Sequence, residues 1–336
     1  MSKLIIPKEY SALLSPMETQ KAIKEIKDYF QNKLAAKLNL QRVSAPIFVQ
    51  PETGLNDNLN GIERRVDFTL KDMNEQIVEV VQSLAKWKRM ALKKYEVLPG
   101  AGIYTDMNAI RRDEEMDNLH SVYVDQWDWE QTITHEQRTK EYLHSVVIAI
   151  YEILKELGSF VNEKYEKISI ELPDEIYFIT TQQLEDLYPY KTPKERERLI
   201  CNKHKAVFIE QIGGELRSGQ KHDGRSPDYD DWKLNGDIIL WNDVLQDAFE
   251  ISSMGIRVDA EAMHNQLIEA GTEGRRTLPF HIAVLNDELP YSIGGGIGQS
   301  RLCMYFLKKA HIGEVQASVW PDEMIVDCMH AGIFLL

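Results

Sequence analysis

The stretch GDIILWNDVLQDAFEISSM, Gly236–Met254, decides the fold class. Apolar residues crowd its two halves, and Asn242-Asp243 between them is a typical turn signal. We therefore expect two strands joined by a short turn. Strands connected in this way pair antiparallel, because parallel strands need a long crossover.

The segments on either side add more strands and several capped helices. Further strands are expected at 43–49, 66–70, 77–81, 103–110, 121–130, 175–180 and 206–212. Helices are expected at 16–38, 83–95 and 134–165, from 193 onward, twice between 259 and 287, and last at 299–309. Their capping boxes pair Ser15 with Glu18, Thr134 with Gln137, and Thr192 with Glu195. Strict alternation of strand and helix is missing, so the sequence predicts an α+β fold with a mainly antiparallel mixed sheet flanked by helices.

The composition excludes several classes of protein. The 336 residues carry a net charge of −14, which argues against non-specific binding to nucleic acid. Cys201, Cys303 and Cys328 are too few and too widely spaced for a disulfide framework or a zinc site. No window approaches the ~20 apolar residues that span a bilayer, and the N-terminus lacks a signal-peptide pattern. We expect a cytoplasmic protein with no membrane or nucleic-acid partner.

The glycine-rich stretch SIGGGIGQSRL, Ser292–Leu302, is a candidate anion site. It fits neither a dinucleotide fingerprint nor a Walker A loop. Glycines permit positive φ and close approach of a ligand, and Arg301 stands at the start of the expected helix. The local pattern leaves two possibilities equally open: a phosphate site, or a tight sheet-to-helix turn with an exposed arginine.

Two strands carry polar side chains that need partners. In SVYVDQWDWE the period of two places Gln126 and Asp128 on one face, where they suit an ammonium group or a polar edge facing solvent. In DAFEISSM the same period puts Glu250 and Ser252 on one face, with Asp237 on the neighbouring strand. Two carboxylates that meet across a hairpin repel unless a cation such as Mg²⁺ lies between them. From spacing alone, a solvated or salt-bridged pair is the stronger alternative.

The loop HDGRSPDYDDW, residues 222–232, concentrates four aspartates with Arg225. It fails as an EF-hand, because Trp232 and Lys233 occupy the places of a ligand and of the invariant glycine. An exposed turn and a mixed-charge loop near a nucleotide both remain open.

Together these pieces resemble the catalytic core of a class II aminoacyl-tRNA synthetase, in the right order. The first helix and LQRVSAP, ending at Pro46, resemble its first motif. NAIRRDEEMDNLHSVYVDQWDWE, with Arg111, resembles the second, and GGGIGQSRL, with Arg301, resembles the third. The blocks SLAKWKR, PDYDDW and QDAFEISSMGIRVDA are similar to the ammonia-dependent asparagine synthetases, and this resemblance runs from about residue 19 to 320.

The resemblance implies a homodimer of single class II-like catalytic domains, here residues 1–336, that forms asparagine from aspartate, ATP and ammonia. The reaction would pass through a β-aspartyl-adenylate and release AMP and pyrophosphate. It implies that ATP is bound by Arg111, Asp237, Glu250, Gly296 and Arg301, with Asp237 and Glu250 also holding Mg²⁺. It implies that aspartate and ammonia are bound by Asp57, Ser83, Lys88, Gln126, Asp128, Arg225, Asp230, Ser252 and Ser253. The expected catalytic residues are Arg111, Arg301 and the two candidates for the carboxylate that deprotonates ammonium, Asp57 and Asp128.

Some features depart from the family pattern or bear on its rivals. Arg112 stands where the family has proline, which leaves the roles of Arg111 and Arg112 to be separated. The second residue is Ser2 and not the cysteine nucleophile of a glutaminase, so free ammonia is the expected nitrogen source. An aspartyl- or asparaginyl-tRNA synthetase would carry an anticodon-binding barrel, and the first class II helix here starts at residue 16. A catalytically silent paralogue would have no chemical need for the phosphate and metal ligands.

Overall fold

The computed structural model describes residues 4–59 and 61–336, so Ser2 lies outside the described residues. Its centre is an eight-stranded mixed sheet in the order β1-β5-β6-β11-β10-β9-β8-β7. The strands are β1 (Leu40–Arg42), β5 (Gly102–Ile110), β6 (Tyr123–Thr132), β11 (Ser292–Gly298), β10 (Asp247–Arg257), β9 (Asp230–Asn242), β8 (Ala206–Glu210) and β7 (Tyr177–Thr180). The β1/β5 and β7/β8 pairs are parallel and the other pairs are antiparallel, which confirms the predicted mixed sheet and the β9–β10 hairpin.

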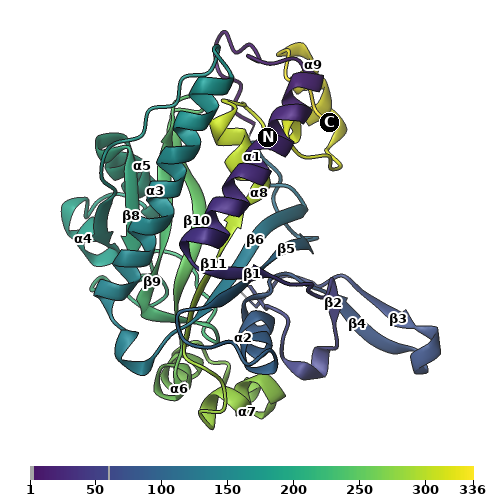
Figure 1. Ribbon diagram of the computed structural model, residues 1–336, viewed down its shortest axis with the longest axis vertical. Coiled ribbons are helices and arrows are strands. Elements are labelled where there is room, and N and C mark those ends of the chain that lie inside the picture. The colour runs from purple at the N-terminus through teal and green to yellow at the C-terminus, as the bar shows by residue number, and fades with distance from the viewer. Residues whose placement is uncertain (1–3, 60) are drawn as a thin grey trace.

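One face of the sheet is covered by α1 (Pro16–Lys37), α3 (Lys140–Lys164) and α8 (Gln299–Phe306), which lie in front of the strands in Figure 1. The main core lies between them and includes Ile26, Phe30, Trp127 and Trp129, each with 0% exposure. Because Trp127 and Trp129 point into this core, Gln126 and Asp128 must point to the opposite face. The predicted alternation along this strand is therefore confirmed.

The opposite face is covered only around its margins. Helix α2 (Ala85–Lys94) packs on β5 and β6, and α5 (Pro193–His204) packs on β8, β9 and β10. Helix α4 (Thr181–Leu187) joins α5, while α6 (Ala260–Glu269) and α7 (Pro279–Leu285) pack together at the lower end of the sheet in Figure 1. Helix α9 (Asp322–His330) lies beside the N-terminal segment. The centre of this face, over β6, β11 and β10, is not covered by these helices and can hold a binding site.

Several predicted boundaries are corrected. The capping boxes at Ser15 and Thr192 are present, but the box at Thr134 caps a 3₁₀ turn, and α3 starts later with Thr139 as its cap. The single strand expected at 43–49 is wrong, because β1 ends before it and β2 (Phe48–Val49) belongs to another sheet. That small sheet, with β3 (Asp67–Leu70) and β4 (Gln76–Val80), projects from the body (Figure 1). Helix α8 is not the last helix, since α9 follows it.

The glycine stretch is a strand, and not the tight turn that was one of the two possibilities left open by its sequence. Ser292–Gly298 forms β11, paired with β6 on one side and β10 on the other, and its glycines do not adopt positive φ. Their small size is needed for a different reason. A Cβ added at Gly294 would lie 2.0 Å from Glu130 Oε2, and one added at Gly296 would lie 2.4 Å from Gln126 Oε1. The glycines therefore make room for polar side chains of the neighbouring strand.

In the part of the chain that the structure describes, no helix combines the length and apolar character needed to cross a membrane.

Candidate active site

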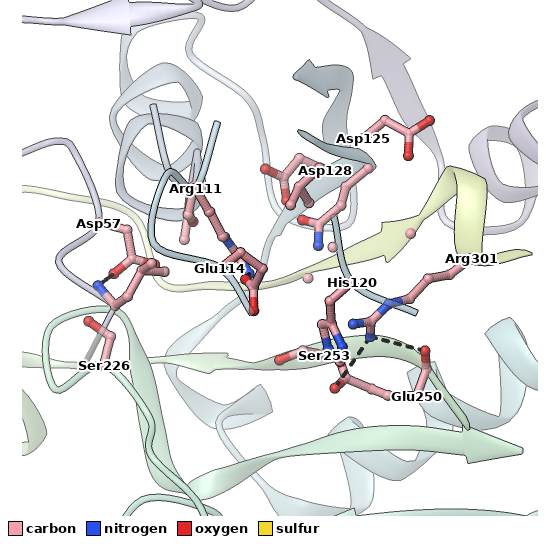
Figure 2. A pocket seen from close by; sticks show the side chains of 18 of the residues that line it. Asp57, Arg111, Glu114, His120, Asp125, Asp128, Ser226, Glu250, Ser253 and Arg301 are labelled. Atoms are coloured by element: carbon pink, nitrogen blue, oxygen red, sulfur yellow. Dashed lines mark hydrogen bonds and ion pairs between the residues drawn. The ribbon is translucent and has the colours of Figure 1, made fainter. Parts of the chain in front are cut away.

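A cavity of about 450 Å³ opens over β6, β11 and β10, and it brings most of the predicted site residues together. The predicted residues that line it are Asp57, Ser83, Lys88, Arg111, Gln126, Asp128, Arg225, Asp230, Glu250, Ser253, Gly296 and Arg301. Figure 2 shows Arg301, Glu250, Ser253 and His120 on one side of this cavity and Asp57 with Ser226 on the other. Residues far apart in the sequence thus share one space.

Two predicted residues, Ser252 and Asp237, do not line the cavity. The expectation that Glu250 and Ser252 share a face is wrong, because β10 has a bulge between them that turns Ser253 toward the cavity. The Ser252 hydroxyl instead donates to the carbonyl of Gly296 at 3.1 Å. The Asp237 carboxylate accepts a hydrogen bond of 2.6 Å from Arg225, and Arg225 itself lines the cavity.

The two guanidinium groups of Arg111 and Arg301 are poorly paired. Arg111 approaches the carbonyl of Gln82 at 3.5 Å and Glu114 at 4.0 Å, and its buried Nε has no hydrogen-bond partner among the described residues. Arg301 approaches the carbonyl and the carboxylate of Glu250 at 3.4 and 3.6 Å. Guanidinium donors that protein groups do not use are available to an anion. This arrangement suits phosphate oxygens.

The structure separates Arg111 from its neighbour. Arg112 is not part of the cavity wall, and its side chain is exposed and donates to the carbonyl of Arg65 at 3.4 Å. The extra cation of Arg112 therefore lies outside the cavity.

Lys88 is buried, and the donors of its ammonium group are all engaged by protein acceptors. Its ammonium donates to Asp128 Oδ1 at 2.8 Å and to the carbonyls of Gly295 and Trp129 at 3.0 and 3.1 Å. Burial lowers the pKa of Lys88, while the nearby Asp128 carboxylate opposes that shift. Since the three donors of an ammonium group are all engaged, Lys88 orients Asp128 and has none left for a ligand.

Asp128 keeps one carboxylate oxygen unused. Its Oδ2 is buried and has no hydrogen-bond partner within residues 4–59 and 61–336, and Gln126 lies beside it on the same face of β6. A buried, unpaired carboxylate oxygen is costly unless a donor binds it. In contrast, Asp57 accepts hydrogen bonds at both oxygens, from the amide of Leu59 at 2.9 Å and from the hydroxyl of Tyr229 at 3.1 Å.

The lining residues that were not predicted as site residues include His120, Tyr229 and Arg257. The Nδ1 of His120 lies 2.9 Å from Asp117 Oδ1. Burial raises the pKa of Tyr229 well above its usual value. Arg257 is buried and bridges Glu130, at 2.7 Å, and Asp230. The charged residue near the end of an apolar strand, in SSMGIRV, was the sequence signal for Arg257.

The chemistry of the donor set allows a magnesium ion near Asp237 and Glu250. Burial raises the pKa of Asp237 to about 6, with Arg225 opposing the shift and the charge of Glu250 adding to it. Such like-charge repulsion favours an added cation. No group of three or more histidine, cysteine, aspartate or glutamate side chains within residues 4–59 and 61–336 could hold a metal. Magnesium does not need such a group, because it is usually held by one or two carboxylates together with substrate phosphates and water.

Comparison with solved structures shows the fold. The asparaginyl-tRNA synthetase of Pyrococcus horikoshii, complexed with asparaginyl-adenylate, superposes with a TM-score of 0.65 over 90% of this chain and 70% of that chain, at 14% identity. The aspartyl-tRNA synthetase of Entamoeba histolytica gives a TM-score of 0.58 over 89% of this chain and 58% of that chain, at 15% identity. The predicted class II synthetase-like fold is confirmed.

Sequence comparison shows the family. The chain is 59% identical to an aspartate–ammonia ligase of Ruminiclostridium cellulolyticum, over 100% of both chains. It is also 59% identical to an aspartate–ammonia ligase of Clostridium tetani, over 99% of this chain and 98% of that one. The sequence profile of the aspartate–ammonia ligase family matches residues 17–332. The chain therefore belongs to the aspartate–ammonia ligase family.

Proposed function

We propose that this protein forms asparagine from aspartate, ATP and ammonia, releasing AMP and pyrophosphate. The observation that carries the proposal is a single cavity lined by two kinds of polar group. Its lining includes the poorly paired guanidinium groups of Arg111 and Arg301, and also Asp128 Oδ2, which has no hydrogen-bond partner among the described residues, beside Gln126. The guanidinium groups suit a polyphosphate and the Asp128 oxygen suits an ammonium group, so ATP and an ammonium-bearing substrate fit one space.

The reaction needs an activated carboxyl group. The β-carboxylate of aspartate attacks the α-phosphorus of ATP, an O–P bond forms, and pyrophosphate leaves with the electrons of the broken P–O bond. Ammonia then attacks the acyl carbon of the β-aspartyl-adenylate, and AMP leaves as asparagine forms. Negative charge spreads over the phosphoryl oxygens in the first step, and preplaced donors such as Arg111 and Arg301 stabilise it.

The aspartate pocket would be formed mainly by paired groups. Asp128, oriented by Lys88, and Asp230, oriented by Arg257, supply fixed carboxylates, while Ser83 and Arg225 complete the wall. Ammonium must lose a proton before it can attack. The free Oδ2 of Asp128 supports Asp128 over Asp57 as the acceptor, because both oxygens of Asp57 already accept hydrogen bonds.

We further propose that Asp237 and Glu250 hold Mg²⁺, which would neutralise phosphate charge when ATP is bound. The charge of Glu250, which helps to raise the pKa of Asp237, supports this assignment. We also propose a cytoplasmic homodimer of single catalytic domains that acts without nucleic acid. The net charge of −14 supports the last point, and light scattering of the purified protein tests the dimer.

One assay tests the function. Purified protein receives ATP, Mg²⁺, aspartate and ammonium, and AMP and asparagine are measured without tRNA. Equal amounts of both products are expected. AMP production without asparagine, or turnover that requires tRNA, contradicts the proposal.

A further inference from the structure

The loop between β8 and β9 carries several cavity residues and is fastened by a buried carboxylate behind the cavity. Arg225, Ser226, Tyr229 and Asp230 line the cavity, whereas Asp228 between them does not. The side chain of Asp228 is 0% exposed. A buried carboxylate is stable only when cations and hydrogen-bond donors surround it.

Three basic side chains from three different elements converge on one oxygen of Asp228. Its Oδ2 lies 3.2 Å from Lys86 Nζ, 3.0 Å from Arg275 Nη1 and 2.9 Å from His281 Nε2. Lys86 belongs to α2, Arg275 to the 3₁₀ turn Glu273–Thr277, and His281 to α7. The other oxygen, Oδ1, accepts a hydrogen bond of 2.8 Å from the hydroxyl of Ser226.

This cluster of Asp228, Lys86, Arg275 and His281 fixes the residues next to it in the chain. Tyr229, one residue later, donates to Asp57, and Asp230 pairs with Arg257. A displacement at Asp228 is therefore passed directly to groups that line the cavity. Asp228, Tyr229 and Asp230 are consecutive in the chain, so the backbone itself couples the position of Asp228 to the cavity.

One residue of the cluster lies on the same helix as the lysine that orients Asp128. Lys86 and Lys88 stand two residues apart on α2, and Lys88 orients Asp128. Helix α2 thus connects the loop above the cavity to the carboxylate at its base. Both are rigid attachments, because Lys86 and Lys88 are each about 1% exposed at the side chain.

We infer that Asp228 is a positioning residue for aspartate binding: its cluster with Lys86, Arg275 and His281 holds the loop so that Tyr229 and Asp230 meet the substrate. The inference rests on the proposed function for the identity of the substrate. It assigns no substrate contact to Asp228 itself. The cluster includes neither Arg111 nor Arg301, the residues proposed to bind phosphate.

Arg275 offers the mildest test, because its side chain is 15% exposed while that of Asp228 is completely buried. We expect Arg275→Met to raise the KM for aspartate about 5- to 20-fold and to leave the KM for ATP within about twofold. Arg275→Lys, which can return a cation, should recover most of the loss. Arg276→Met is the matched control, since Arg276 is the next residue and contacts the carbonyl of His264 instead of Asp228. It should leave both constants unchanged.

Hydrogen–deuterium exchange of residues 223–231 provides a second measurement that does not depend on turnover. Exchange should be faster in Arg275→Met than in Arg276→Met. Asp228→Asn should show the larger effect if it folds, and Arg275→Met decides the question if it does not. Equal increases in both KM values, or unchanged exchange together with an unchanged KM for aspartate, would overturn the inference. A wild-type protein that makes no asparagine would instead refute the proposed function, and the exchange comparison would still decide whether the cluster holds the loop.

Discussion

Replacing Gly296 by alanine tests the argument that the β11 glycines make room for neighbouring polar groups. The new Cβ would lie 2.4 Å from Gln126 Oε1, 2.9 Å from its Cδ and 3.1 Å from Asp128 Oδ1. Ordinary carbon–oxygen contact needs more than 3 Å, so the amide of Gln126 must move. Gln126 is only partly buried and can do so toward the cavity.

The expected loss is therefore catalytic. A displacement of about 1 Å in a substrate-positioning group costs up to about 10²-fold in rate. We expect kcat/KM for aspartate to fall about 10- to 100-fold, or about 1.4–2.7 kcal/mol of transition-state stabilisation. The free energy of unfolding should change by less than about 1 kcal/mol, because alanine restricts the unfolded chain and offsets part of the crowding.

Gly294→Ala is the contrasting variant. Its Cβ would lie 2.0 Å from Glu130 Oε2 and 2.6 Å from Arg257 Nη2, which form a buried ion pair. Overpacking of such a site costs about 1–3 kcal/mol, and more if the ion pair breaks. Urea unfolding of both variants and steady-state kinetics make the comparison. If Gly296→Ala unfolds as easily as Gly294→Ala yet keeps its kcat/KM, the space-making argument is refuted.

Three further predictions follow from the same geometry. Arg301→Ala should lower kcat/KM for ATP about 10²- to 10³-fold, while Arg112→Ala, outside the cavity, stays within about twofold; equal losses in steady-state assays would contradict the phosphate role of Arg301. Chelation of magnesium with EDTA should abolish asparagine formation and added Mg²⁺ should restore it; activity that survives chelation would remove the role proposed for Asp237 and Glu250. Burial lowers the pKa of His311 from 6.5 to about 4, with Asp117 opposing the shift, so protons favour the unfolded chain and stability falls as the pH drops from about 6.5 to about 4. His311→Asn keeps an acceptor for the amide of Gly313 but cannot titrate, so its unfolding free energy should depend less on pH over this interval than that of the wild type, and equal slopes would contradict the assignment.

Local patterns predicted what local interactions determine. The capping boxes of Ser15 and Thr192 involve residues three apart, and both are present. The alternation that separates Gln126 from Trp127 depends only on the strand period, and it too was predictable.

What the sequence did not predict has a common physical cause, which is contact between residues distant in the sequence. The glycines of β11 are explained by Glu130 and Gln126 on another strand, and this contact could not be read from the local pattern, which left a tight turn open where a central strand exists. The bulge in β10 turns Ser253 and not Ser252 toward the cavity, because an extra residue reverses the alternation of faces in the part of the strand that follows it. No spacing rule could have shown that the three donors of Lys88 are used by the protein.

The buried ion pairs beneath the cavity orient the carboxylates that line it more than they stabilise the fold. A buried ion pair contributes little net stability, because the loss of hydration offsets most of the attraction. Arg257 nevertheless joins Glu130 of β6 to Asp230 of β9, and Glu130 also accepts from the hydroxyl of Ser292 and lies 3.9 Å from Lys88. The network thus ends at two cavity carboxylates, Asp230 through Arg257 and Asp128 through Lys88. Since each carboxylate is held from behind by a cation, neither can turn away when a charged substrate arrives. Gly294 is the residue that makes this possible, because any side chain there would occupy the space in which Glu130 and Arg257 meet.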